Sequence, residues 1–243
     1  MLAGLMKWAY GTWAFRKPLY NYLSATPFDN RSVEYKQSLQ YLGECEHVLD
    51  VACGTGTFMQ QFKKKIIGVD INPDNVKYCM ERGLNVVEGS ATALPFEDNS
   101  FDGLHCSHLL QVFSPDMAAQ FMREAGRVVK NDGVIVISAL NWFPRFFRHP
   151  ENVRPYPPDA IHRLCQVQSG ATSPMYPGIP NFHQEDIWFR RPPLIEFVGF
   201  TPEEDMWLWR LNPLQQKRGI VKFWTFDSYI IKLRLKKASA NTA

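Results

Sequence analysis

Two glycines in a short turn are the residues best suited to bind a ligand. Gly54 and Gly56 belong to the run VLDVACGTG at positions 48–56, which predicts a buried strand that ends in a tight turn and opens a helix. Glycine lets the backbone approach a ligand closely, and a helix N-terminus presents free N–H groups and a positive dipole end. The turn is therefore suited to a cofactor that carries a carboxylate or another anionic group.

An acidic residue lies near the end of the next predicted strand, IIGVDI at positions 66–71. The carboxylate of Asp70 can accept two hydrogen bonds from the neighbouring hydroxyls of a ribose. The alternative is an ordinary turn in which Asp70 caps the helix that begins at Pro73. A nicotinamide dinucleotide is disfavoured, because Met59 stands at the third glycine of the G-x-G-x-x-G pattern and Asp70 follows Gly56 by 14 residues, where about 20 are usual.

The elements that must position these residues alternate along the chain. Apolar runs predict strands at 47–52, 66–71, 84–88, 101–106 and 134–140, and further patterns predict helices at 31–42, from the glycine turn to 63, at 73–82 and at 115–130, with a tight turn at 131–133. Five alternations of strand and helix predict an α/β fold with a doubly wound, mostly parallel sheet.

The alternation breaks after Asn141. Residues 141–182 contain many prolines and aromatic residues without a clear period, which is typical of a functional insertion. A helix is expected again at about 184–198, although Pro192 and Pro193 must interrupt it, and strand-like runs follow at 204–210 and 226–235. We expect one domain over residues 1–243, with an N-terminal lid at 1–30 and a cap insertion at 141–193.

The composition narrows the classes of function. A chain of 243 residues with 45% hydrophobic and 21% charged residues is typical of a globular protein. A net charge of +3 without a dense Lys/Arg stripe argues against nucleic acid as the partner. Five scattered cysteines, no signal-peptide pattern and no apolar run of about 18 residues predict a soluble cytoplasmic protein, and peripheral contact with a membrane stays open.

Four ordered segments between about residues 45 and 140 carry a more specific pattern: VLDVACGTG, GVDINPDNVKYC, GSATALPFEDNSFDGLHCSHLLQVF and REAGRVVKNDGVIVIS. Together they resemble the class I, Rossmann-like methyltransferases that use S-adenosylmethionine (SAM), in particular the ubiquinone/menaquinone C-methyltransferase-like group (methyltransferase type 11). The run VGF and the strand-like segments after it resemble the closing unit of that fold. The resemblance implies a seven-stranded sheet with an antiparallel last strand and an aromatic cap after the fifth strand.

The resemblance also implies which residues hold SAM. Around the methionine portion and the methyl group it places Asp50, Ala52, Cys53, Gly54, Gly56, Cys106 and Ser107. Around the ribose and the adenine it places Asp70, Ile71, Ser90 and Ala91. The family often has glycine where Ala52 stands and aspartate where Ser90 stands, so the hydrogen bond to the adenine amino group is weaker here or comes from another residue.

The acceptor side is less defined. His108 follows the fourth strand, where an acceptor approaches, and is the candidate general base; the alternative is that it only packs at the start of a helix. His105 and His108 lack a third ligand of matching spacing, so no metal is expected. In this family the lid and the cap fold over the carboxyl edge of the sheet, which makes substrate candidates of Tyr10, Trp13, Tyr22, Trp142, Arg145 and Phe146.

The lid and cap residues have three interpretations: a site for a hydrophobic acceptor with an acidic group, a membrane-surface contact, or a cover that buries its own aromatic rings. The whole pattern favours an enzyme that moves the methyl group of SAM to a small or amphipathic acceptor, such as a lipid, quinone or saccharide, by in-line displacement. The alternatives are an RNA or protein methyltransferase, a SAM-binding regulatory protein without catalysis, and a nicotinamide-dependent reductase.

Overall fold

The computed structural model describes residues 31–140, 150–165, 176–190 and 228–237. The chain divides into two compact units, Met1–Glu34 and Tyr35–Ala243, and the sheet belongs to the second unit. The expected lid at 1–30, the first part of the cap at 141–149 and the strand-like run at 204–210 lie outside the described residues.

Strands and connecting helices alternate through the described residues. The strands are β1 (His47–Val51), β2 (Lys65–Asp70), β3 (Val86–Glu88), β4 (Phe101–Ser107), β5 (Val129–Leu140), β6 (Asn181–Arg190) and β7 (Ser228–Lys236). The helices are α3 (Arg31–Tyr41), α4 (Pro73–Met80), α5 (Pro115–Val128) and α6 (Pro158–Cys165), with short 3-10 helices η1 (Met59–Gln61) and η2 (Leu110–Val112).

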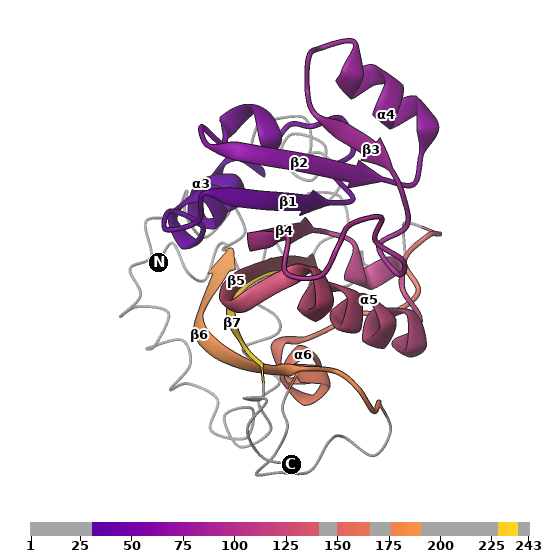
Figure 1. Cartoon of the computed structure of the whole chain (residues 1–243). Coiled ribbons are helices and arrows are strands. Elements are labelled where there is room, and N and C mark those ends of the chain that lie inside the picture. Colours follow the sequence, from indigo (N-terminus) through magenta and orange to yellow (C-terminus); the bar gives the residue numbers. More distant parts are fainter. Residues whose placement is uncertain (1–30, 141–149, 166–175, 191–227, 238–243) are drawn as a thin grey trace, which may run out of the picture. The chain divides into compact units, whose positions relative to one another are not determined.

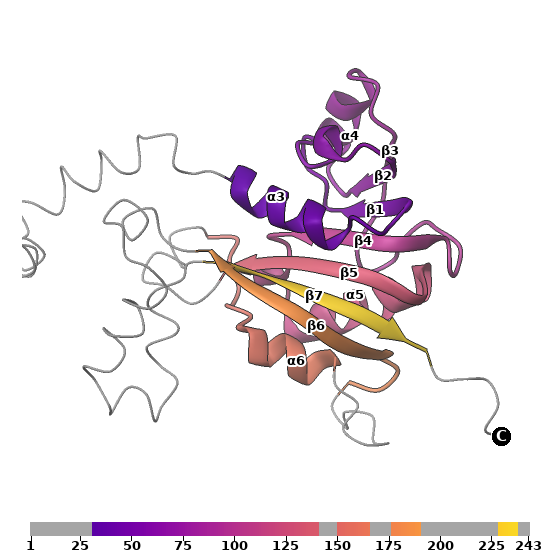
Figure 2. The same ribbon diagram turned by 90° about the vertical axis from the view of Figure 1, so that its left-hand side faces the viewer.

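The strands form one sheet in the order β3-β2-β1-β4-β5-β7-β6. Strands β1 to β5 pair in parallel with one another, whereas β7 is antiparallel to both β5 and β6. Figure 2 shows this order from β3 at the top to β6 at the bottom, with the arrowhead of β7 pointing opposite to that of β6. The prediction of a mostly parallel sheet of seven strands with an antiparallel last strand is confirmed.

Helices cover both faces of the sheet (Figure 1). In β1, alternate side chains point to opposite faces, as the period of two in a strand requires. Leu49 joins the buried cluster that contains Phe121 of α5 and Ile161 of α6, whereas Val48 joins the cluster that contains Tyr41 of α3. The strands are therefore apolar on both sides, which explains the nearly continuous apolar runs in the sequence.

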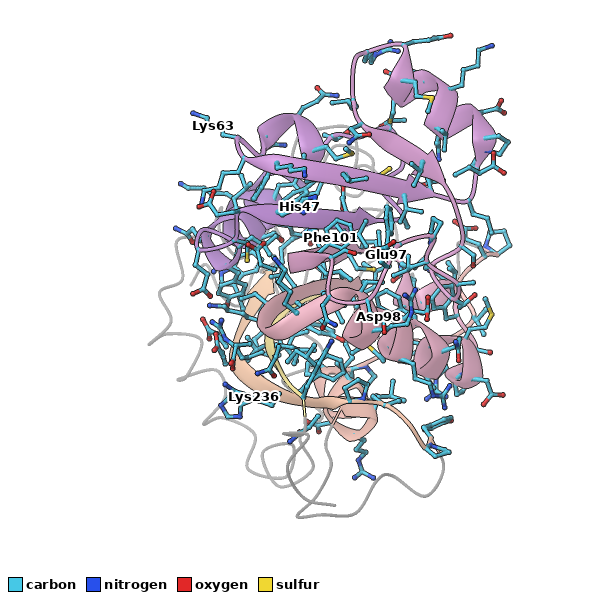
Figure 3. The ribbon with its side chains drawn as sticks, in the orientation of Figure 1. His47, Lys63, Glu97, Asp98, Phe101 and Lys236 are labelled. Atoms are coloured by element: carbon cyan, nitrogen blue, oxygen red, sulfur yellow. The ribbon has the colours of Figure 1, made fainter. Side chains whose placement is uncertain are left out.

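The amino edge of the sheet is closed by aromatic and charged contacts. Near the starts of β1 and β4, the rings of His47 and Phe101 lie beside each other, with their centroids 4.8 Å apart (Figure 3). Lys236, at the end of the antiparallel strand β7, forms an ion pair with Asp132 at the start of β5. Ligands of such sheets bind at the opposite edge, beyond the carboxyl ends of the parallel strands.

One expected helix does not form. The sequence predicted a helix from the glycine turn to Lys63, but η1 is a single turn of 3-10 helix, and the prediction is wrong. The connection from Val51 to Lys65 has only 13 residues (52–64), close to the minimum of about a dozen for a parallel crossover. The glycine turn uses the first part of this connection, so no length remains for a helix with a useful dipole.

The segment after α6 also differs from the expectation. Residues 181–190 form strand β6 and not the start of a helix, and residues 191–198 lie outside the described part of the chain. Pairing with β7 decides this, since β6 is paired from Asn181 to Arg190 with one register shift before Asp186. The region expected as a cap, 141–193, thus contains α6 and a strand of the sheet.

Two smaller observations complete the fold. The run expected as a strand at 226–235 contains β7, and the expected tight turn at 131–133 lies inside the long strand β5, with Asp132 at φ 62°. In the part of the chain that the structure describes, no helix has the length and apolar character needed to span a bilayer.

Candidate functional site

Asp70 and the glycine turn lie in direct contact. The N–H of Gly54 donates to Oδ2 of Asp70 over 2.8 Å, and the N–H of Cys53 donates to the carbonyl of Val69 over 3.1 Å. The N–H of Gly89, after β3, donates to the carbonyl of Asp70 over 3.0 Å. The ends of β1, β2 and β3 therefore meet around Asp70, at the carboxyl edge of the sheet.

The backbone of the turn is left-handed at three positions. The φ angles are 56° at Ala52, 54° at Gly54 and 73° at Gly56. A Cβ added to Gly56 would lie 2.3 Å from Cδ1 of Leu84 and 3.2 Å from Sγ of Cys79, so no side chain fits there. A Cβ added to Gly54 would meet nothing within 4 Å. Gly56 thus permits tight packing, whereas Gly54 borders open space that a ligand can use.

The carboxylate of Asp70 has one acceptor position left. Its Oδ1 accepts from the N–H of Asn72 over 2.9 Å and from Nδ2 of Asn75 over 3.2 Å, in addition to the bond from Gly54 to Oδ2. A carboxylate offers about four lone-pair sites, and three are used. The side chain of Asn72, and not that of Asp70, caps α4, because its oxygen accepts from the N–H of Asp74. Asp70 is therefore free of the capping role that was the alternative interpretation.

The adenine-side candidates follow the ends of β2 and β3. Ile71 is an apolar residue with 72% of its surface exposed, so it offers a bare surface beside Asp70. Ser90 follows Gly89 and is half-buried; its Oγ shares a hydrogen bond with Oγ1 of Thr92 at 2.9 Å and accepts from the N–H of Thr92. The hydroxyl of Ser90 is therefore paired within its own turn, and the next residue, Ala91, is half-buried.

Asp50 lies below the turn, inside the sheet. Its Oδ1 is 2.7 Å from Nδ1 of His105, its register partner on β4, and both residues are buried. Oδ2 of Asp50 is also buried and has no hydrogen-bond partner among the described residues. The sequence interpretation considered His105 only as a metal ligand and missed this pair. A histidine within the apolar strand FDGLHCS was the available signal, because a buried imidazole needs a polar partner.

The two cysteines of the predicted site face the core. Cys53 packs with Met59 and Cys79, and Cys106 lies fully buried in the cluster that contains α5. Burial, followed by the negative charge of Asp50, raises the pKa of both thiols far above its ordinary value. Neither thiol is therefore a nucleophile at neutral pH.

His108 is held in an unusual conformation after β4. Its φ is 55°, a left-handed value that costs a non-glycine residue about 1–2 kcal/mol. Its N–H donates to the carbonyl of Ser138 over 2.8 Å, and its carbonyl accepts from Nε2 of Gln111 over 2.7 Å. Ser107 precedes it, in register with Ser138 of β5. Such strain is common at functional sites and supports the choice of His108 as a candidate.

Gln111 is a residue that the sequence interpretation missed. Its side chain donates to His108, and its backbone carbonyl accepts from the N–H groups of Val153 and Arg154 over 2.8 and 3.2 Å. It thus ties the segment after β4 to residues more than 40 positions later, a contact that no local sequence signal marks. The substrate candidates of the lid and cap, Tyr10, Trp13, Tyr22, Trp142, Arg145 and Phe146, lie outside the described residues.

A sheet of order 3-2-1-4-5-7-6 with only β7 reversed, and with a glycine turn after β1 that meets an acid at the end of β2, defines the class I Rossmann-like methyltransferase fold. A solved structure of a SAM-dependent methyltransferase from Archaeoglobus fulgidus has this fold. It superposes with a TM-score of 0.59 at 22% identity and covers 83% of this chain and 91% of its own.

Sequence comparison leads to the same class. Residues 49–137 match the model of a family described as a methyltransferase domain. The chain is 26% identical to erythromycin 3''-O-methyltransferase of Saccharopolyspora erythraea over 75% of this chain and 64% of that protein. It is 34% identical to demethylmenaquinone methyltransferase of Corynebacterium kroppenstedtii over 38% of this chain and 41% of that protein.

The match to the methyltransferase-domain family covers residues 49–137 of this chain, and the superposed protein from Archaeoglobus fulgidus is a SAM-dependent methyltransferase. The chain spans less than two thirds of the length of the curated relatives named above.

Proposed function

We propose that this protein is an enzyme that transfers the methyl group of SAM to a small or amphipathic acceptor. The observation that carries the proposal is the hydrogen bond from Gly54 to Asp70, because it brings the open side of the glycine turn and an acceptor for a ribose hydroxyl to one place.

The described residues fit the three portions of SAM. The left-handed turn at Ala52, Gly54 and Gly56 exposes backbone to the methionine portion, with no help from a helix dipole. The remaining acceptor position of Asp70 suits a ribose hydroxyl, and the bare surface of Ile71 suits the adenine ring. We infer that Asp50, Cys53, Ser90, Ala91, Cys106 and Ser107 complete this binding site.

When bound, SAM supplies a methyl group on a positively charged sulfur. The chain needs to hold an acceptor in line with that group and to exclude water, and a base is needed only where the acceptor is protonated at neutral pH. His108 is the proposed base, since it follows β4 and two hydrogen bonds hold its backbone in place. The lid and cap residues are proposed to surround the acceptor.

The acceptor class rests on the relatives. The names of these two relatives describe an O-methyltransferase that acts on erythromycin and a methyltransferase that acts on demethylmenaquinone, both of which are small molecules. A small or amphipathic acceptor is therefore proposed in preference to RNA or protein. The described cysteines Cys45, Cys53, Cys79 and Cys106 are free thiols, which supports a reducing compartment such as the cytoplasm.

Calorimetry with SAM and with NADH, followed by transfer from methyl-labelled SAM to a panel of quinols, macrolides, lipids, RNA and protein, tests the proposal. We expect binding of SAM and not of NADH, and label in at least one small molecule. Binding of NADH alone would overturn the cofactor assignment. Tight binding of SAM with label recovered only in RNA or protein would overturn the acceptor class.

A further inference from the structure

The Asp50–His105 pair is buried beneath the glycine turn. The two residues lie directly opposite each other on β1 and β4, and Nδ1 of His105 is 2.7 Å from Oδ1 of Asp50. Their side chains are only 3% and 1% exposed. Because a carboxylate only accepts hydrogen bonds, the N–H at Nδ1 donates a hydrogen bond to Oδ1, and Nε2 of His105 is buried without a hydrogen-bond partner among the described residues. This hydrogen bond determines the orientation of the carboxylate.

The ring of His105 is held by the connection that contains the turn. Phe58, two residues after Gly56, stacks on the imidazole with ring centroids 3.6 Å apart and planes 17° apart. Tyr35 of α3 covers the imidazole at its edge, with centroids 6.4 Å apart. The turn, the imidazole and the carboxylate therefore form one packed unit, in which a change at His105 reaches both Asp50 and the turn.

The second oxygen of Asp50, Oδ2, has no hydrogen-bond partner among the described residues. Oδ2 is fully buried and accepts no hydrogen bond, although an unpaired buried carboxylate oxygen costs free energy. Asp50 is the penultimate residue of β1, so its side chain lies two positions before the turn begins at Ala52. A cationic donor from a ligand in the turn would satisfy this oxygen.

We propose that His105 is a positioning residue: by holding Oδ1 of Asp50, the acid that the family resemblance places at the methionine portion of SAM, it keeps Oδ2 available to the ammonium group of that portion. This inference rests on the proposed function. Proton transfer by His105 is a poorer explanation, since the ring lies inside β4, two residues before the strand ends at Ser107, and is packed between Phe58 and Tyr35.

Two thioether ligands separate the contribution of the amino-acid portion from that of the rest of the cofactor. S-adenosylhomocysteine carries it, whereas 5′-methylthioadenosine has the same nucleoside and sulfur without it. Calorimetry on the full chain gives the ratio of the two dissociation constants. We expect His105→Phe, which keeps an aromatic ring but loses the N–H, to weaken S-adenosylhomocysteine by about 10- to 100-fold and 5′-methylthioadenosine by less than about threefold. His105→Asn places an amide N–H near the position of Nδ1, and we expect it to restore most of the ratio.

Asp50→Asn is a second variant in which the ratio of the two dissociation constants tests the inference. It keeps the shape of the side chain and an oxygen for His105 but removes the charge, so the affinity ratio is expected to fall as in His105→Phe. If His105→Phe yields no folded protein by circular dichroism, the ratio in Asp50→Asn decides. An unchanged ratio in the folded variants, or equal losses for both ligands, would overturn the inference. If the unaltered chain binds neither ligand, the proposed function itself fails, which is a different outcome.

Discussion

Replacing Asp70 should weaken cofactor binding by an amount that the structure limits. Three of about four lone-pair sites on the carboxylate are occupied by Gly54, Asn72 and Asn75, so one hydrogen bond to the ribose remains available. A hydrogen bond to a charged group contributes about 1.5–3 kcal/mol. The expected loss for Asp70→Ala is therefore about 10- to 150-fold in the dissociation constant of S-adenosylhomocysteine. If the carboxylate bound both ribose hydroxyls and also kept its three contacts within the chain, the replacement would weaken binding by more than this.

The assay must separate the ribose contact from damage to the turn, because Asp70→Ala also removes the partner of the Gly54 N–H. Calorimetry with S-adenosylhomocysteine and with its 2′,3′-dideoxy analogue makes this separation. A ribose contact predicts that the variant and the unaltered chain bind the dideoxy ligand with similar affinity. Asp74→Ala is the matched control, because Asp74 is an exposed carboxylate on the first turn of α4.

Two results would refute this reasoning. If Asp70→Ala binds S-adenosylhomocysteine within about threefold of the unaltered chain, Asp70 makes no ribose contact. If the affinity falls equally for the two ligands, Asp70 acts only by shaping the turn through Gly54.

Three further predictions concern stability and catalysis. Ala52→Gly should raise the free energy of unfolding by about 0.5–1 kcal/mol, because relief of left-handed strain of about 1–2 kcal/mol exceeds the entropic cost of glycine. Gly54→Ala is the reverse change at a similar φ and should lower the free energy of unfolding. If urea denaturation shows that both variants raise it, or that both lower it, the strain argument is contradicted. Hydrogen bonds from Arg234 lower the pKa of Glu185 to about 2 from 4.5, so the ion pair stabilises the folded chain above pH 4.5 and stops doing so as the pH falls towards 2. Glu185→Gln should therefore lower the free energy of unfolding at pH 7 and reduce its fall in acid; an equal loss at pH 7 and pH 2 would exclude this linkage. His108→Ala should reduce methyl transfer by about 10²- to 10⁴-fold while S-adenosylhomocysteine still binds, and full activity on an identified acceptor would end the proposal of a base.

Local sequence signals were sufficient for most of the sheet. The first five strands are apolar on both faces, and this produces runs such as VIVIS that need no tertiary information to recognise. The start of α4 was also readable, because Asn72 and the proline after it are the residues that a helix start prefers. The nearness of Gly54 and Asp70 followed from the same information, since parallel neighbouring strands end at one edge.

Connections that depend on length or on distant partners were predicted less well. The helix expected after the glycine turn is absent, because 13 residues must both form the turn and return to the sheet. Residues 181–190 form a strand because β7, about 40 residues later in the chain, supplies hydrogen bonds along their whole length. Periodicity within a segment contains neither piece of information.

The sequence alone determined the class of fold and the two elements that we propose to hold the cofactor, because strand periodicity and glycine turns are encoded by adjacent residues. Only the tertiary structure decided which side chains meet beneath and beside them. The Asp50–His105 pair joins residues 55 positions apart, and Gln111 joins His108 to the segment at Val153. Such contacts depend on strand register and on chain connections that close in space, and both are decided when the whole sheet assembles.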